Sequence, residues 1–172
     1  WKWDGIRLQV LRRDDVVLWS RGEERLDGRF PEIDAAALAL PAGTVLDGEL
    51  LAWPATAGSS EPLPFTSLQK RINRLKPGTR LLAEVPVRVQ AYDLLEFEGE
   101  DLRARPLEER RVKLLALLAA IGDPRLMASP EIFATDWGDA DQLRQSARER
   151  GVEGLMLKRR ESPYQAGRRR GD

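Results

Sequence analysis

The strongest strand pattern in this chain covers residues 87–97, and it constrains the fold more than any other segment. Val87, Val89 and Ala91 lie on one face of this strand, and a Glu-Gly-Glu turn follows at residues 98–100. A strand of this length that ends in a tight turn predicts a sheet as the main structure of the protein.

The remaining elements predict a mixed fold. Residues 6–11 and 16–19 alternate around a polar turn and predict a hairpin. Residues 44–53 predict a further strand, bulged at Gly48, and residues 154–158 predict a short final strand. Helical patterns cover residues 30–40, 65–75, 106–121 and 139–150. Because hairpins and helices mix without regular β-α-β alternation, we expect an α+β fold with mainly antiparallel sheets flanked by helices.

Histidine and cysteine are both absent from the 172 residues, and this limits the possible chemistry. Ser-His-Asp catalysis, Cys-His catalysis and the usual zinc sites are excluded. A nucleophile must therefore be lysine, serine, threonine, tyrosine or a carboxylate. A bound metal should be a hard cation held by oxygen atoms, such as Mg²⁺ or Mn²⁺.

The charges balance, with 28 Lys and Arg against 28 Asp and Glu, so net charge does not indicate a nucleic-acid partner. Six basic residues nevertheless gather within residues 158–170, against the single acid Glu161. Such a segment suits a phosphate backbone, and a solvated charged tail explains it equally well. No run approaches the ~18 apolar residues of a membrane span, so we expect no membrane partner. Without cysteine the redox compartment is undetermined, and an intracellular location is the default expectation.

Lys2 is the strongest chemical candidate, because an amine, an Asp-Gly turn and Arg7 lie within six residues at the start of a strand. That set suits attack on a phosphorus atom whose oxygens need neutralising. Other unusual polar groups taken singly have good structural interpretations. Asp47-Gly48 resembles a turn, Tyr92 a core residue and Glu153 a loop residue.

Taken in order, these segments resemble the nucleotidyltransferase motifs of ATP-dependent DNA ligases of the bacterial and archaeal cellular type. K-W-D-G-I-R at residues 2–7 matches the family signature K-x-D-G-x-R. L-D-G-E-L at 46–50 and E-G-L-M-L-K at 153–158 resemble two further motifs. Residues 89–95 resemble the strand that supplies an aromatic ring to adenine, and residues 164–170 the segment before the last motif. The resemblance implies the ATP-grasp-like nucleotidyltransferase fold of DNA ligases and capping enzymes.

The resemblance also implies covalent catalysis. Lys2 would attack the α-phosphorus of ATP, pyrophosphate would leave, and lysyl-AMP would remain. AMP would then pass to the 5′-phosphate at a nick in double-stranded DNA, and the 3′-hydroxyl would displace AMP and seal the strand. A free lysine amine has a pKa of about 10.4, so nearby cations and partial burial would have to favour the neutral nucleophile.

Residues that would bind the nucleotide follow from the same resemblance. Arg7 would contact the ribose or the nick end, and Arg21 the ribose or a phosphate. Tyr92 would stack on adenine, Lys158 would lie near the α-phosphate, and Arg169 would bind a phosphate of the nucleotide or of the DNA.

The metal would be Mg²⁺ or Mn²⁺, held by Glu153 and by Glu49, and Glu49 could instead bind the ribose hydroxyl. Asp4 would orient Lys2 or cap its turn, and Gly5 would supply a backbone conformation with positive φ. The basic helix at residues 65–74 has two interpretations of equal weight, an amphipathic surface helix and a DNA-facing one.

We interpret residues 1–172 as one adenylation domain, truncated at both ends. The chain starts too late to show a glutamate that usually precedes the lysine in this family. It also stops before the last motif, lacks an oligonucleotide-binding (OB-fold) domain and lacks any amino-terminal DNA-binding domain. The isolated chain should therefore self-adenylate weakly. We expect a monomer, located in the cytoplasm at the nucleoid if the source is prokaryotic.

Other functions stay open from the sequence. An RNA ligase or an mRNA-capping guanylyltransferase would use the same superfamily motifs on another substrate. A non-catalytic nucleic-acid-binding module would keep the fold without forming a lysyl adduct. A domain with coincidental motifs is the weakest alternative, because five matches in order are hard to produce by chance.

Overall fold

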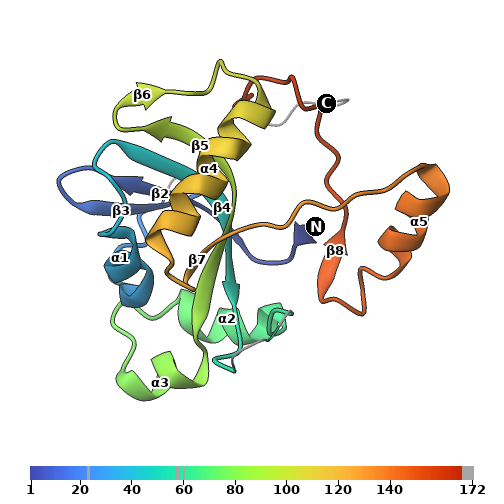
Figure 1. The fold of residues 1–172 in the computed structure, drawn as a ribbon. Helices are drawn as coiled ribbons and strands as arrows, with labels where there is room; N and C mark the ends of the chain where they lie inside the picture. Colours follow the sequence, from blue (N-terminus) through green and yellow to red (C-terminus); the bar gives the residue numbers. More distant parts are fainter. Residues whose placement is uncertain (23, 57–58, 60, 168–172) are drawn as a thin grey trace.

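The computed structural model describes residues 1–22, 24–56, 59 and 61–167, and its main body is a six-stranded sheet (Figure 1). The strand order β3-β2-β4-β5-β6 is antiparallel throughout, and β7 joins β5 in parallel. These strands are β2 (Ile6–Arg12), β3 (Val16–Ser20), β4 (Thr44–Ala52), β5 (Val87–Phe97), β6 (Glu100–Asp101) and β7 (Leu126–Ala128).

Five helices accompany the sheet in the described part of the chain: α1 (Pro31–Ala37), α2 (Phe65–Ile72), α3 (Thr79–Glu84), α4 (Leu107–Ile121) and α5 (Trp137–Gln145). Helix α4 packs on β5 and β7, and α1 packs on β3, β5 and β7 (Figure 1). None of the helices in the described ranges has both the length and the apolar character that a membrane crossing requires.

The side-chain alternation of the strands gives the sheet two different faces. Leu8, Leu46, Leu50 and Val89 are fully buried in the apolar core that the helices complete. The residues between them in sequence project from the opposite face, as expected for strands with a side-chain period of two. Polar residues therefore gather on the face that the core helices do not cover.

A second, smaller unit contains the chain's first strand. Strand β1 (Lys2–Trp3) pairs antiparallel with β8 (Val152–Gly154), next to α5 (Figure 1). Trp3 packs edge-on against Trp53 with ring centroids 6.1 Å apart, and its indole N–H donates to Ser129 Oγ at 2.9 Å. This small apolar cluster fixes β1 beside the main sheet.

The amino end of α4 is closed by a distant segment, residues 159–164, which we call the C-terminal strap. Pro106 precedes the helix and provides no side-chain cap. Instead, the first free N–H groups of the helix, at Leu107 and Glu108, donate to the carbonyls of Ser162 and Arg160, each at 3.0 Å. The strap therefore takes over the capping role that a serine or aspartate usually has.

A buried ion pair joins α4 to the sheet. Arg110 Nε and Nη2 donate to the two carboxylate oxygens of Asp93 at 2.8 and 2.9 Å, and both side chains are almost fully buried. Arg110 Nη1 also donates to the carbonyl of Ser162 at 3.2 Å. The same guanidinium thus ties β5, α4 and the strap together.

Most of the predicted elements are confirmed. The hairpin, the strand at residues 87–97 and the helix at residues 106–121 are present, and the last ends at Gly122 in a left-handed conformation (φ 64°). The register of β4 against β5 shifts between Asp47 and Gly48, where a bulge was predicted. The helix predicted at residues 30–40 is shorter and ends at Ala37.

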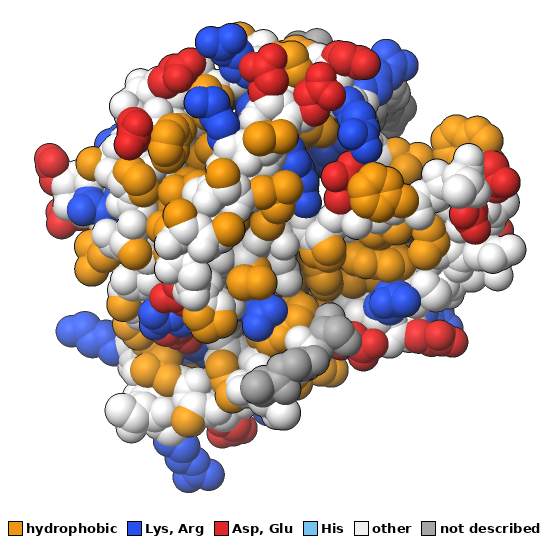
Figure 2. Space-filling model, in the orientation of Figure 1, with side chains coloured by type: hydrophobic (Ala, Val, Ile, Leu, Met, Phe, Trp, Pro, Cys, Tyr) orange, Lys and Arg blue, Asp and Glu red, His pale blue; other side chains and the backbone are white. Residues whose placement is uncertain are grey.

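The prediction of a strand at residues 154–158 is wrong, because the strand is Val152–Gly154 and regular structure stops there. Gly154 has a φ of 149°, which ends the extended pairing. Met156 and Leu157 are exposed, and Figure 2 shows hydrophobic side chains gathered around α5 and β8. Alternating apolar residues thus predicted a strand at a place where, in the described ranges, no partner strand lies alongside.

Four short elements were not predicted, namely the two-residue strands β1 and β6 as well as α3 and β7, and one helix is displaced. Helix α3 has six residues and β7 has three, too short for a recognisable period. Helix α5 starts at Trp137 instead of residue 139, because Asp136 caps it by accepting from the Asp139 N–H at 2.9 Å. It ends at Gln145, and turns replace the helix that was predicted to continue to residue 150.

Replacing Arg110 by alanine should lower the free energy of unfolding by about 3–5 kcal/mol, because Asp93 would stay buried without a countercharge. Val112→Ala is the matched control on the same helix, since Val112 is 67% exposed. Urea unfolding of both variants provides the measurement. A loss below about 1 kcal/mol for Arg110→Ala would show that the pair does not hold α4 on the sheet.

Candidate functional site

The pairing of β1 with β8 brings Lys2 together with Glu153. Lys2 lies opposite Gly154 in this ladder, and its amine donates a hydrogen bond to the carboxylate of Glu153. Both side chains are about half exposed, so the pair is accessible from solvent. The predicted nucleophile and a predicted metal ligand therefore lie side by side, although nearly the whole chain separates them in sequence.

Gly5 lets the chain pass closely over β4 between β1 and β2. A Cβ at Gly5 would lie 2.4 Å from the carbonyl oxygen of Leu50 and 2.7 Å from Leu51 Cδ2. The backbone of Gly5 is not among the positive-φ positions, so the predicted reason for this glycine is wrong. The position needs glycine because no side chain fits against β4.

Arg7 and Asp47 form the centre of the polar face of the sheet. Arg7 Nε donates to Asp47 Oδ1 at 3.2 Å, and Nη2 donates to Oδ2 at 2.7 Å. The side chain of Asp47 is fully buried, while that of Arg7 is 38% exposed. The hydrogen bond to Asp47 raises the pKa of Arg7, so its guanidinium is a permanent positive charge.

Two tyrosine hydroxyls also converge on Asp47. Tyr92 donates to Oδ1 at 3.4 Å, and Tyr164, from the end of the strap, donates to Oδ2 at 2.9 Å. Burial, followed by the charge of Asp47, raises the pKa of each hydroxyl, so both are neutral donors. Asp47 thus accepts from Arg7 and from both tyrosines.

Lys158 lies over the ring of Tyr92. Its Nζ is 4.5 Å from the ring centroid, a cation–π contact. The residue as a whole is exposed, but its amine lies inside the site, and burial lowers the pKa of Lys158. The ring face that was predicted to receive adenine therefore carries an ammonium group in this structure, close to Asp47.

Glu49 lies opposite Arg7 in the β2–β4 ladder and is the most perturbed acid of the site. Burial raises the pKa of Glu49 to about 7, and the charges of Asp47, Glu153 and Asp4 add to that rise, while Arg7 opposes it. With this pKa, the carboxyl is partly protonated near neutral pH, and a nearby cation would favour its ionised form.

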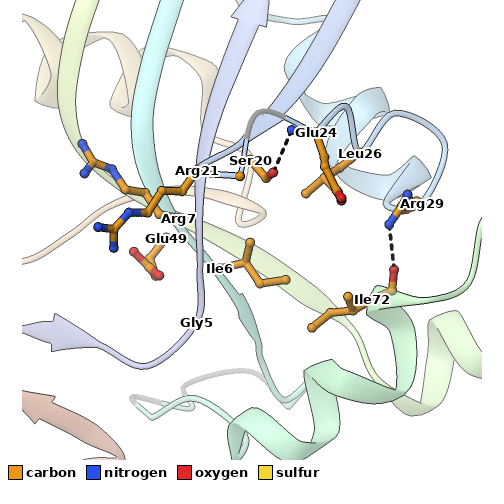
Figure 3. Close-up of a pocket in the computed structure, with 11 residues that line it drawn as sticks. Gly5, Ile6, Arg7, Ser20, Arg21, Glu24, Leu26, Arg29, Glu49 and Ile72 are labelled. Atoms are coloured by element: carbon orange, nitrogen blue, oxygen red, sulfur yellow. Dashed lines mark hydrogen bonds between the residues drawn. The ribbon is translucent and has the colours of Figure 1, made fainter. Parts of the chain in front are cut away.

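A concave pocket of about 360 Å³ opens beside these residues. In Figure 3, the side chains of Arg7, Arg21 and Glu49 lie on the same side of β2, and Gly5 lies at the lower end of this strand. Arg21 is exposed, and its backbone N–H donates to the Arg7 carbonyl at 3.3 Å. The pocket can hold a group of nucleoside size between two guanidinium groups and a carboxyl.

The site offers two carboxylates, Glu49 and Glu153, for the predicted metal ion. Within the described ranges, no cluster of three or more Asp or Glu side chains is close enough to hold an ion by itself. Mg²⁺ usually takes one or two carboxylates and completes its shell with substrate phosphates and water. Glu49 and Glu153, which feel each other's charge, fit that pattern.

One arginine of the basic helix at residues 65–74 lies outside the site. Arg71 is fully buried and bonds the Glu32 carboxylate, the Val85 carbonyl at 2.9 Å and the Arg29 carbonyl at 3.2 Å. It therefore fits neither interpretation of the basic helix, surface or DNA-facing. Arg169 lies outside the described residues.

Sequence reasoning missed the role of Asp47. Its motif was recognised, but the residue itself received no function, although an aspartate within an apolar strand signals a specific buried partner. Arg7 and Tyr92 bond this acid directly, and its charge acts on Glu49 and Lys158; Lys2 is linked to the group through Glu153, whose charge acts on Glu49.

Comparison with known proteins gives consistent results. The profile of a family described as "ATP dependent DNA ligase domain" matches residues 1–172. A probable DNA ligase of Koribacter versatilis is 35% identical over an alignment of 191 positions, which covers 98% of this chain and 32% of that protein. The chain therefore spans about a third of the length of that relative.

Two solved structures of mycobacterial ligases are similar as well. The ligase domain of LigD from M. tuberculosis has a TM-score of 0.72 at 30% identity, over 97% of this chain and 50% of that one. Mycobacterial DNA ligase D complexed with ATP and MES has a TM-score of 0.70 at 32% identity, over 97% of this chain and 49% of that one.

Gly5→Ala should displace β1 and cost roughly 1–3 kcal/mol in unfolding free energy, because the new methyl group meets the β4 backbone. Gly78→Ala is the matched control, since nothing lies within 4 Å of a Cβ there. Chemical denaturation compares the two. Equal stability of both variants would contradict the close approach at Gly5.

Glu49→Gln should stabilise the protein increasingly as pH rises. The pKa of Glu49 is about 7 in the folded state against an ordinary value of 4.5, so wild type loses stability between these two values as the carboxyl ionises. Glutamine avoids this loss, and the difference should level off above pH 7 at no more than roughly 3 kcal/mol. Urea unfolding of both proteins at pH 5 and pH 8 tests it; a gap that shrinks with pH would refute it.

Proposed function

The chain belongs to the ATP dependent DNA ligase domain family, and from that premise we propose that it forms a covalent lysyl-AMP from ATP at Lys2. The predicted α+β nucleotidyltransferase fold is confirmed by the match to solved ligase structures. The observation that carries the proposal is the β1–β8 pairing, which sets the Lys2 amine against Glu153, and the charge of Glu153 in turn acts on Glu49 of the polar face.

In the proposed step, Lys2 Nζ forms a bond to the α-phosphorus of ATP, and the bond from that phosphorus to pyrophosphate breaks. The amine must give up a proton before it attacks. The Glu153 carboxylate accepts a hydrogen bond from this amine and is half exposed, so it would pass the proton on to water and stay ionised for the metal. The covalent intermediate divides the overall reaction into easier steps.

The polar face supplies positive charge for the nucleotide. Arg7 is held in place by Asp47 and would bind the ribose, while Arg21 at the pocket rim would bind ribose or phosphate. Lys158 would move from the Tyr92 ring towards the α-phosphate, which leaves the ring free to stack on adenine. Such stacking contributes about 1–3 kcal/mol.

Glu49 and Glu153 would hold Mg²⁺ or Mn²⁺ together with the phosphates of ATP. The metal would neutralise charge that develops on the phosphate oxygens during attack. Glu49 would gain most from this ion, because burial and neighbouring acids disfavour its charged form. In the ribose alternative, a neutral Glu49 would donate its proton to a hydroxyl oxygen.

The later steps belong to the whole protein. We propose that AMP passes from Lys2 to the 5′-phosphate of a nick in double-stranded DNA, and that the 3′-hydroxyl then displaces AMP. Arg169, with the basic residues after Lys158, would bind phosphates in these steps. Further parts of the whole protein would also bind the DNA in these steps.

Lys2→Ala in the full-length protein should abolish the AMP adduct, which intact-protein mass spectrometry detects after incubation with ATP and Mg²⁺. Lys113→Ala is the matched control, because Lys113 lies on α4 and packs over Phe97 of β5. This variant should form the adduct as wild type does. An adduct that persists in Lys2→Ala would exclude Lys2 as the nucleophile. Labelling of wild type by GTP but not ATP would instead support a capping-type guanylyltransferase.

A further inference from the structure

The hydroxyl of Tyr164 completes a closed set of hydrogen bonds around Arg7. It accepts from Arg7 Nη2 at 3.1 Å and donates to Asp47 Oδ2 at 2.9 Å. Asp47 Oδ2 in turn accepts from the same Nη2 at 2.7 Å. Arg7, Asp47 and Tyr164 therefore form a ring of three groups, in which each one fixes the other two.

The donors of Arg7 show what this ring accomplishes. An arginine has five N–H groups in a planar fork. Nε donates its one hydrogen to Asp47, and Nη2 donates one to Asp47 and one to Tyr164. Among the described residues, Nη1 donates to no protein atom. The two acceptors thus fix the guanidinium plane and leave Nη1 for a bound group beside the pocket.

Tyr164 reaches this position because the C-terminal strap is firmly attached. Its backbone N–H donates to the Arg103 carbonyl at 2.7 Å, and the Ser162 carbonyl accepts from the first turn of α4 and from Arg110. The hydroxyl then meets an acid that lies 117 residues earlier in the chain. The contact is therefore set by packing on both sides and not by a flexible tail.

The exposure of Arg7 beside the buried Asp47 supports a role beyond packing. The Asp47 side chain is fully buried, but that of Arg7 is 38% exposed and lines the pocket. Without the tyrosine oxygen, one Nη2 hydrogen would lose its acceptor and the guanidinium could rotate towards solvent. A hydrogen bond to a charged group is stronger than one between neutral groups, so its loss is measurable.

We propose that Tyr164 is a positioning residue that holds Arg7 in the orientation needed to bind the ribose or phosphate oxygens of ATP. The inference rests on the proposed function and extends it, because it assigns a task to a residue that does not itself touch the nucleotide. Tyr164 acts through Arg7, so its effect appears in nucleotide affinity and disappears when Arg7 is altered.

Tyr164→Phe in the full-length protein tests this, because it removes the hydroxyl and keeps the ring. We expect the KM for ATP in adduct formation to rise about tenfold, with kcat changed less than twofold. The dissociation constant for ATP, measured by calorimetry in a Lys2→Ala background that cannot react, should rise by the same factor. An unchanged KM and dissociation constant would overturn the inference.

A double-mutant cycle with Arg7→Lys separates positioning from general loosening. Lysine cannot make the paired bonds to Asp47 and Tyr164, so Tyr164→Phe should have no further effect on ATP affinity in that background. Additive losses from the two changes would overturn the inference. Because affinity is measured without turnover, the cycle stays readable even if Arg7→Lys abolishes the reaction.

Glu131→Gln is the matched control for the strap. Glu131 accepts from Arg160 of the strap at 2.9 Å, in an exposed ion pair outside the site. This variant should keep the wild-type KM, and the same rise as in Tyr164→Phe would overturn the inference by showing that any loosening suffices. Wild type that forms no lysyl-AMP would defeat the proposed function; normal adducts in wild type together with a wild-type KM for ATP in Tyr164→Phe would defeat only the inference.

Discussion

The burial of one carboxylate, that of Asp47, organises the polar face of this protein. A charged group without solvent has to be paired and hydrogen-bonded, or it becomes too costly to keep. Asp47 meets this requirement with partners from three places: Arg7 on the neighbouring strand β2, Tyr92 on β5, and Tyr164 at the end of the strap. Arg7, Tyr92 and Tyr164 are therefore held by hydrogen bonds to a single buried acid at the centre of the sheet.

A second buried carboxylate supports the first. Asp93 lies opposite Asp47 in the β4–β5 ladder, and its pair with Arg110 holds α4 and, through Ser162, the strap. The strap that delivers Tyr164 to Asp47 is thus attached beside a neighbouring acid of the same sheet. The Arg7–Asp47 pair therefore depends on the Arg110–Asp93 pair, because loss of Arg110 would loosen the strap that places Tyr164 against Asp47.

Much of the fold and part of the site could be predicted from the sequence. Long elements such as β5 and α4 carry enough periods to be recognised, and two residues of the resembling motifs, Lys2 and Glu153, are in contact in the structure. The strand predicted after Gly154 failed because alternation does not show whether a partner strand exists. Gly5 was assigned the wrong reason, because a close approach to β4 is a tertiary fact. Arg71 and Tyr164 depend on contacts with distant segments, which no local pattern encodes.

The pairing of β1 with β8 also bears on how the site is assembled over time. Lys2 and Glu153 lie 151 positions apart, so their contact closes nearly the whole chain. Contacts of such long range form late in folding, because the entropy of closing a large loop must be offset by structure that already exists. During synthesis, the antiparallel sheet from β2 to β5 can therefore form on the ribosome while Lys2 still lacks its partner. Lys2 therefore gains its contact with Glu153 only after the segment that contains β8 has been synthesised.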